Sequence, residues 1–394
     1  MKAFPSARRR SGQRGFTLIE LMISLVLSMA VLIGLSSVYV AVKSAFRFQE
    51  STGRLQEDAN FALDTISREL RMAGFAGCAG IQTQTVSGVT TRYPGNVLAS
   101  SNPNTISGPN PLATVESGNA EVTVQPFTPL NFIRGFDSVP STMFASGSVP
   151  ASSGTDSLFF AGGSANTVGV TVDMPAGNSP LTISSNVYGW SGPNTMIVSD
   201  CNSSSIFEGT VSTSAGVTTI AHDGTGNSAD TFTNSYQFGP PITSGASARA
   251  GAIVMLAQWN FFYVATRSGA STPSLYRITF NGASRSNAEE LVSNVESMQL
   301  HYGENTQVDA SGAATRVADE WRTSAADVTD WARIVAVRVG LMMVSAEDNT
   351  SPDVVLTTPT LLGQTYSLPT GASTNRLRKE FSTTVVLRNS VAAR

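Results

Sequence analysis

The first part of the chain carries two successive patterns of hydrophobic and polar residues. From residue 16 to 42 the residues are uncharged and mostly apolar, with Glu20 as the single exception. As a helix this stretch would be about 40 Å long, enough to cross the roughly 30 Å hydrocarbon layer of a membrane. Between residues 55 and 70 apolar side chains instead recur every three or four positions among charged ones, which is typical of an amphipathic helix. The two patterns predict one long helix over residues 16–75, whose first part, 16–42, is transmembrane.

The remaining chain has the short runs of hydrophobic residues that are typical of β-structure. Residues 76–250 are rich in Ser, Thr, Gly and Asn, with β-prone runs between turn signals, which predicts a large, loop-rich β elaboration. In residues 251–394 the apolar runs are longer and alternate, which predicts an antiparallel β-sheet region. The strands expected there cover residues 252–265, 274–280, 295–303, 333–344 and 381–388. The predicted fold class is therefore α+β, with the second half of the long helix packed on the sheet.

Positive charge is concentrated at the start of the chain. The formal net charge is −3, but five basic residues and no acidic residue precede Phe16, and without these five the chain has 20 basic and 28 acidic residues, a net of −8. Cations before an apolar helix favour a cytoplasmic N-terminus and a body on the far side of the membrane. A secretory signal is cut after its apolar stretch, whereas Gly15 lies directly before it. We therefore expect residues 1–15 to be a leader peptide whose removal leaves the helix on the mature chain.

Glu20 is the one charged residue within the apolar stretch. A carboxylate in a membrane helix costs about 2.5–3.5 kcal/mol on insertion scales, and such a group usually marks function. After cleavage behind Gly15, the new α-amino group of Phe16 on a neighbouring subunit can supply the matching positive charge. The alternative is a glutamate near the helix end whose side chain reaches the membrane interface.

The chain has two cysteines, Cys78 and Cys201, and neither belongs to a CxxC or Cys/His cluster. A metal site needs three or four ligands at short spacing, so we expect no metal and no cofactor. If the body lies outside the cytoplasm, the two cysteines can form a disulfide that closes a long loop, which contributes roughly 4 kcal/mol in a chain-entropy picture. The alternative is two separate buried thiols.

Catalytic and nucleic-acid functions have little support in the sequence. His222 and His301 are the only histidines, and there is no nucleophile elbow, phosphate-binding loop or zinc-protease motif, so we expect no enzymatic activity. Residues 76–250 contain only three basic residues, too few for a surface that neutralises phosphates.

Charged residues gather at three places in the last third of the chain. The acidic groups have oxygen ligands that suit calcium, although a solvated loop face explains them better. The basic group is explained better by a solvated strand edge than by a DNA site. These residues are Asp327 and Asp330, then Glu347, Asp348 and Asp353, and the basic Arg376, Arg378 and Lys379.

The residues from Arg14 to Leu21, with the sequence R-G-F-T-L-I-E-L, resemble the class III signal of type IV prepilins and of type II secretion pseudopilins. The resemblance implies that a prepilin peptidase cuts between Gly15 and Phe16 and methylates the new N-terminus at Phe16. It also implies that Glu20, the fifth residue of the mature chain, aligns incoming subunits on a growing filament.

Other segments resemble the PilW-type minor pilins, whereas the middle of the chain does not. These segments are residues 72–78, 295–303, 337–341 and 384–389. The resemblance implies a pilin-like fold and a role in priming a type IV pilus, which serves motility, adhesion or DNA uptake. The implied partners are other minor and major pilins, the prepilin peptidase, the inner-membrane assembly platform and a tip adhesin.

The resemblance further implies an inner-membrane anchor with a periplasmic body, which joins the pilus fibre after assembly. Direct nucleic-acid binding is not expected. Two alternatives remain: a minor pseudopilin of a type II secretion system, and a membrane-tethered periplasmic binding or adhesin module.

Overall fold

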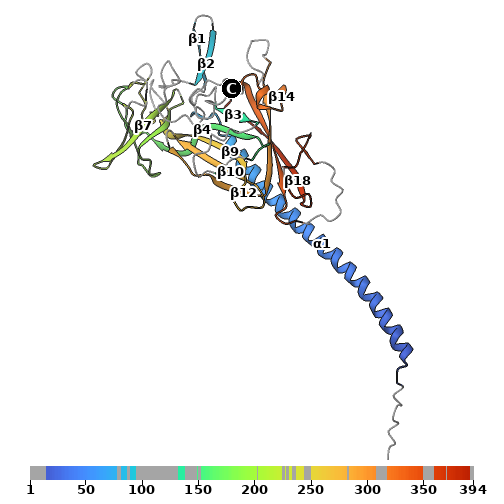
Figure 1. Cartoon of the computed structure of the whole chain (residues 1–394). Helices are drawn as coiled ribbons and strands as arrows, with labels where there is room; N and C mark the ends of the chain where they lie inside the picture. Colours follow the sequence, from blue (N-terminus) through green and yellow to red (C-terminus); the bar gives the residue numbers. More distant parts are fainter. Residues whose placement is uncertain are drawn as a thin grey trace, which may run out of the picture.

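The computed structural model has one long helix joined to a body of β-sheets (Figure 1). The described residues are 15–77, 81–86, 89–94, 132–137, 149, 152–201, 203–223, 227, 230–232, 237–243, 250–281, 284–307, 317–348, 359–369 and 371–390. This helix is α1, Leu18–Leu70, whose 53 residues reach about 80 Å. The structure therefore confirms the predicted α+β organisation, with one long apolar N-terminal helix and antiparallel sheets.

Ten strands form the larger sheet. They are β3 (Ile133–Phe136), β4 (Ser157–Gly169), β5 (Leu181–Ile183), β6 (Pro193–Ser199), β7 (Ser204–Ser214), β8 (Val217–Ala221), β9 (Ile253–Ala265), β10 (Ser274–Asn281), β11 (Ser284–Arg285) and β12 (Glu289–Ser293). The long strand β9 lies at the centre: β4 pairs along one edge, and β6 and β10 share the other. From β6 the sheet continues through β7 and β8 to the short edge strand β5. Because β4 to β8 precede residue 250 and β9 follows it, the sheet contains strands from both predicted β regions.

Four strands form the smaller sheet, in the order β14-β13-β15-β18. They are β13 (Val295–Glu304), β14 (Glu320–Arg322), β15 (Ile334–Val344) and β18 (Arg378–Val386). The short elements outside the two sheets are the hairpins β1 (Ile81–Val86) with β2 (Val89–Pro94) and β16 (Thr360–Leu361) with β17 (Gln364–Thr365), and the 3-10 helices η3 (Ala325–Asp327) and η4 (Trp331–Arg333). The five strands predicted after residue 250 are confirmed as β9, β10, β13, β15 and β18, with ends shifted by at most three residues.

The second half of α1 packs on the body through a stripe of mainly small and branched side chains. Its buried residues are Leu55, Ala59, Ala62, Thr65, Ile66 and Leu70. The spacing of three and four residues is the one that the sequence predicts. α1 contacts β12, β15 and β18, and its buried stripe shares one continuous core with both sheets.

A second core lies in the part of the larger sheet built from β5 to β8. Phe207, Phe232 and Phe238 pack edge to face there. The ring of His222 contacts Phe207 and Phe232, and its Nε2 lies 3.0 Å from the carbonyl oxygen of Ser179. His222 is therefore a structural residue of this core.

α1 ends before Phe75, the predicted limit of the helix, because the chain turns sharply into the larger sheet. Gly74 has φ +74°, a left-handed conformation that glycine adopts readily. Two main-chain hydrogen bonds join the turn to β4: Gly74 N–H donates to Ala161 O at 2.8 Å, and Gly163 N–H donates to Phe75 O at 2.7 Å.

The end of α1 is also attached to the smaller sheet and to the edge of the larger one. Beyond β18, the side-chain amide of Asn389 donates to the carbonyl oxygens of Arg71 and Ala73, at 3.2 and 3.3 Å. Arg277 of β10 forms ion pairs with Glu69 of α1 and with Glu289 of β12. Both sheets therefore hold the last turn of the helix.

Candidate functional site

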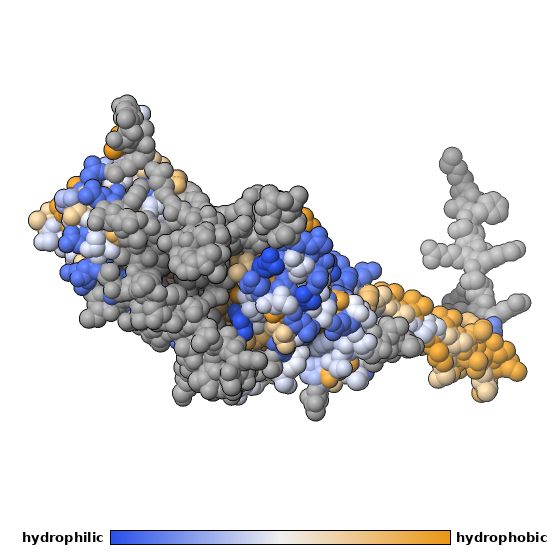
Figure 2. Space-filling view, turned by 90° about the horizontal axis from the view of Figure 1, so that it is seen from above, coloured by the Kyte–Doolittle hydropathy of each residue, from blue (hydrophilic) through white to orange (hydrophobic). Residues whose placement is uncertain are grey.

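The first half of α1 protrudes from the body as an apolar rod. Figure 2 shows hydrophobic residues along the rod and polar residues where the body begins. α1 is the one helix within the described ranges that is long and apolar enough to cross a membrane. None of its most apolar stretch is buried in the body. Such a surface requires either lipid or the apolar surface of another protein.

Three serine hydroxyl groups of the rod bond to its own backbone. Ser24, Ser28 and Ser37 donate to carbonyl oxygens three or four residues earlier, at 2.9, 2.7 and 2.8 Å. A membrane-spanning segment must satisfy its polar groups internally, because the bilayer core offers no water. These three serines are therefore compatible with a hydrocarbon environment.

Glu20 lies in the first turn of α1, just after the N-cap residue Thr17. The side-chain oxygen of Thr17 accepts a hydrogen bond from the backbone N–H of Glu20 at 3.3 Å. A carboxylate in the first turn is also favoured by the unpaired N–H groups of the helix start. Sequence reasoning missed this cap, although the spacing Thr-x-x-Glu before an apolar run is the signature of a capping box.

Gly15 and Phe16 lie in non-helical backbone directly before the N-cap. Phe16 is 83% exposed, and a side-chain carbon added at Gly15 would meet no atom within 4 Å. Gly15, Phe16 and Glu20 are thus together at the free tip of the rod, while residues 1–14 lie outside the described residues. Cleavage, methylation and subunit alignment at these positions stay predictions.

Cys201 lies in the turn between β6 and β7 and is disulfide-bonded. Cys78 lies outside the described residues, so its pairing with Cys201 stays a prediction. The chain just before Cys78 runs beside that turn: the hydroxyl of Ser204 donates to Ala76 O, and Gly77 lies so close to Ser199 that a Cβ there would overlap with it. A bond between the two cysteines would join the end of α1 to the larger sheet.

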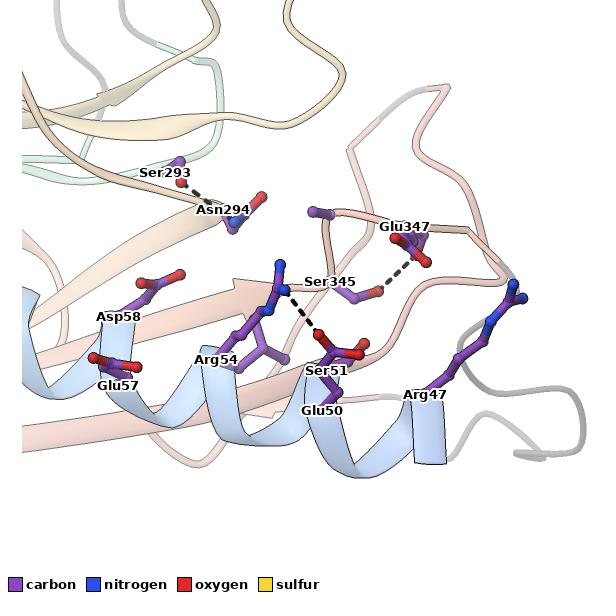
Figure 3. A pocket seen from close by; sticks show the side chains of 12 residues that line it. Arg47, Glu50, Ser51, Arg54, Glu57, Asp58, Ser293, Asn294, Ser345 and Glu347 are labelled. Atoms are coloured by element: carbon purple, nitrogen blue, oxygen red, sulfur yellow. Dashed lines mark hydrogen bonds and ion pairs between the residues drawn. The ribbon is translucent and has the colours of Figure 1, made fainter. Parts of the chain in front are cut away.

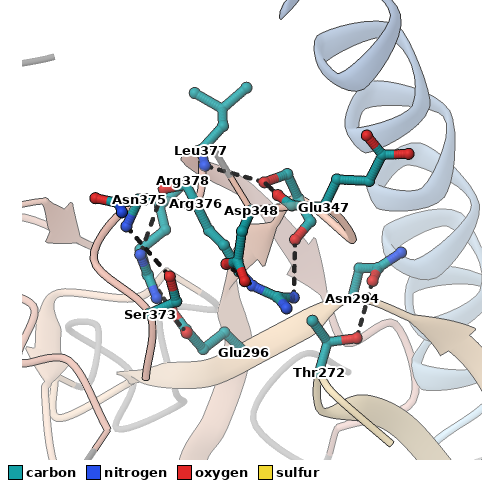
Figure 4. Close-up of polar contacts among 11 residues, drawn as sticks. Thr272, Asn294, Glu296, Glu347, Asp348, Ser373, Asn375, Arg376, Leu377 and Arg378 are labelled. Carbon is teal, nitrogen blue, oxygen red and sulfur yellow. Dashed lines mark hydrogen bonds and ion pairs between the residues drawn. The ribbon is translucent and has the colours of Figure 1, made fainter. Parts of the chain in front are cut away.

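Of the basic residues after residue 375, Lys379 is exposed on the edge strand β18, as the sequence predicts, whereas the side chains of Arg376 and Arg378 are mostly buried. Arg378 forms a two-pronged ion pair with Glu296 of β13, at 2.6 and 2.8 Å, and their side chains are only 3% and 4% exposed (Figure 4). The Tyr366 hydroxyl donates to the same carboxylate at 3.2 Å. Burial and the nearby Glu296 raise the pKa of Tyr366, so it stays a neutral donor. The prediction is wrong for Arg378 because Glu296, far away in the sequence, neutralises its charge.

The described acidic residues of these groups, Asp327, Asp330, Glu347 and Asp348, are exposed, and the side chains of Asp330 and Asp348 have protein partners. Asp348 pairs with Arg376 at 2.9 Å, and Asp330 accepts a hydrogen bond from Ala332 N–H at 2.9 Å as the N-cap of η4. In the part of the chain that the structure describes, no group of three or more His, Cys, Asp or Glu residues could hold a metal ion. Asp353 lies outside that part.

Asp156 is a buried carboxyl group between the two sheets. It precedes β4, and its carboxylate accepts a hydrogen bond from Leu300 N–H of β13 at 2.7 Å. Its own N–H donates to Met298 O at 2.8 Å. Burial raises the pKa of Asp156 to about 7, while the bond from Leu300 opposes the rise and the charge of Asp137 adds to it.

The raised pKa of Asp156 makes stability depend on pH. The folded chain binds a proton at Asp156 more tightly than the unfolded chain does, so this stabilisation is present below pH 4 and is lost as pH rises to about 7. Asp156→Asn stays neutral and is expected to exceed the parent chain in stability at pH 8 by about 2–4 kcal/mol. Urea unfolding of the full chain in detergent, at pH values from 4 to 8, measures this. Parallel stability profiles of the two proteins would contradict the prediction.

The sequence matches two family models. Residues 261–389 match the family described as Type IV Pilus-assembly protein W. The matched part covers the end of β9, the strands β10, β11 and β12 of the larger sheet, and all of the smaller sheet. Residues 10–36 match the Prokaryotic N-terminal methylation motif, which covers Gly15, Phe16 and most of the apolar stretch 16–42. No curated protein and no solved structure matches the chain.

The two matches and the exposed apolar rod agree with one another. The matched pilus-assembly family consists of structural pilins, and the methylation motif lies at the residues that begin the rod. The chain therefore carries a domain of the type IV pilus-assembly protein W family behind an N-terminal methylation motif, and it is a type IV pilus-related pilin.

Proposed function

We propose that the chain is a minor pilin that takes part in priming and assembling a type IV pilus, without catalysis of its own. The observation that supports this best is the combination of a methylation motif with a bare apolar rod on a body of the pilus-assembly family. A rod of this kind serves first as a membrane anchor and then as the part that packs inside a filament.

The proposed mechanism has three steps at the tip of the rod. Prepilin peptidase cuts after Gly15 on the cytoplasmic side and methylates Phe16. The carboxylate of Glu20 then pairs with the N-terminal amine of a neighbouring subunit. Finally the apolar rods pack against one another as the subunit leaves the bilayer, so that protein surface replaces lipid.

The proposed location is the inner membrane with a periplasmic body, and the pilus fibre after assembly. The disulfide at Cys201 supports a body outside the cytoplasm, because such bonds persist in oxidising compartments. The proposed partners are other minor and major pilins, the inner-membrane assembly platform and a tip adhesin.

The family match favours a pilus over a type II secretion filament, although both would use the same rod. The methylation motif also argues against a simple tethered adhesin, which needs no glycine before its anchor. Deleting the gene and counting surface pili, with secreted type II substrates measured in parallel, separates these functions. Loss of secretion with normal piliation would contradict the proposal.

The cleavage step predicts a defined N-terminus. Mass spectrometry of the mature protein should find a chain that begins with N-methylated Phe16. Gly15→Leu should leave the leader attached, because a large side chain replaces the glycine before the cut. Gly34→Leu is the matched control, since Gly34 also lies in the apolar stretch with open space around it, and it should be processed normally. A mature chain that begins at Met1, or that lacks residues 16–42, would refute the proposed class.

A further inference from the structure

A polar cavity lies where α1 leaves the body. It has a volume of about 310 Å³ and is bounded by α1 on one side and by the turns after β12 and β15 on the other (Figure 3). The charged residues that line it are Arg47, Arg54, Glu50, Glu57, Asp58 and Glu347. With two cations and four anions, the lining is net negative but contains both signs.

The length of the apolar rod places this cavity at the membrane surface. The 22 residues from Leu21 to Val42 are uncharged. As a helix they span about 33 Å, close to the thickness of a hydrocarbon core. Lys43 then lies at the outer boundary, and Arg47 and Glu50 lie about 6 and 10 Å beyond it. The headgroup layer adds roughly 5–7 Å on each side, so the rim of the cavity is within reach of lipid headgroups.

The rim presents a cation and carboxylates side by side. Arg47 has no ion-pair partner within the described part of the chain, and Figure 3 shows it without a dashed line. Glu50 pairs with Arg54 at 2.8 Å, but these side chains are 50% and 74% exposed, so the pair is weak and exchangeable. Glu347 approaches from the opposite wall (Figure 3). A guanidinium group suits a phosphate, and carboxylates suit an ammonium group.

The inner side of the cavity is partly buried, and hydrogen bonds hold its side chains in place. Leu55, which is 2% exposed, forms part of its lining. Burial raises the pKa of Asp58, against the opposing effect of a hydrogen bond from Asn294. Asn294 is held in turn by a hydrogen bond from the Thr272 hydroxyl at 3.0 Å. The wall opposite α1 is therefore positioned by the fold.

We propose that this cavity binds the headgroup of a phospholipid of the phosphoethanolamine class, with the phosphate at Arg47 and the ammonium group at Glu50 and Glu347. A headgroup that has a phosphate and no amine would be repelled by the net negative charge of the lining. A choline headgroup has no N–H donors for the carboxylates. The site is filled while the subunit waits in the membrane, and it empties when the subunit enters a filament. The inference requires only that α1 spans the bilayer.

The test uses the full chain in nanodiscs made from equal amounts of phosphatidylethanolamine, phosphatidylcholine and phosphatidylglycerol. Native mass spectrometry counts the lipids that stay on the released protein. We expect phosphatidylethanolamine to exceed its share in the disc by about two- to fivefold, the range for one or two exposed charged contacts. Arg47→Gln and Glu347→Gln should each return the ratio to that of the disc. Both residues are exposed at the surface, so the fold should persist.

Arg68→Gln and Asp64→Asn are the matched controls, because they make the same charge changes on exposed positions of α1 away from the cavity. They should leave the lipid ratio unchanged. Equal retention of all three lipids, a preference for phosphatidylglycerol or phosphatidylcholine, or a preference that survives Arg47→Gln would each overturn the proposal. Failure of the chain to enter nanodiscs would instead contradict the membrane anchor, so the two ideas fail separately.

Discussion

Glu20→Gln is expected to reduce incorporation of the subunit into filaments at least tenfold, while leader cleavage continues. The substitution keeps the size of the side chain and removes its charge, so the ion pair with a neighbour's N-terminal amine is lost. A tenfold loss corresponds to about 1.4 kcal/mol. This is less than the interaction energy of several kcal/mol that two close opposite charges can have near a protein surface. The measurement is the amount of this subunit in sheared pilus fractions relative to that in membranes.

The capping role of the first turn requires its own control. Thr17→Val removes the N-cap hydrogen bond to Glu20 N–H but leaves the charge, and it should cost about 1 kcal/mol of local helix stability. If incorporation depends on the charge, Thr17→Val should assemble far better than Glu20→Gln. Normal incorporation of the Glu20→Gln variant would contradict pairing of Glu20 with a neighbour's amine. Equal defects in both variants would mean that Glu20 acts by stabilising the start of the helix.

Glu296→Gln is expected to destabilise the body by about 3–5 kcal/mol, because it leaves the Arg378 guanidinium buried without a counter-charge. Chemical unfolding of the full chain in detergent, followed by the fluorescence of its tryptophans, measures the change. The double variant Glu296→Gln/Arg378→Met should recover much of the loss, since it removes both buried charges.

An exposed ion pair supplies the comparison. Glu50→Gln breaks the pair with Arg54 on the surface of α1 and should change the unfolding free energy by less than about 0.5 kcal/mol. A similarly small effect of Glu296→Gln would mean that the pair with Arg378 is hydrated in solution, contrary to its 3% and 4% exposure.

The features that sequence patterns predict here are those set by neighbouring residues. The rod, its amphipathic second half and the strands after residue 250 all follow from local periodicity. Strands β6 and β7 escape prediction because Ser, Thr and Asn fill much of their length, and packing in the sheet overrides their weak propensity. The central place of β9 also has no local signal, since its partners β4 and β6 lie before a long loop-rich stretch.

The same distinction applies to the candidate site. Gly15, Phe16 and Glu20 form a contiguous motif, so the sequence alone indicates them. The partners of Arg378 and Asp156 lie 82 and 144 residues away in the chain, and only the folded structure brings them together. The cavity where α1 leaves the body could not be predicted for the same reason. The turns after β12 and β15 that complete it are far from α1 in the sequence.

The attachment at the end of α1 has a mechanical consequence. In the proposed filament, tension would pull the subunit along α1, and that force would enter the body where the helix ends. Two kinds of hydrogen bond would carry the load there. The main-chain bonds of Gly74 and Gly163 join the helix end to β4 of the larger sheet, and the side-chain bonds of Asn389 join it to the smaller sheet. Such a force would therefore be shared between the two sheets and would not fall on one of them alone.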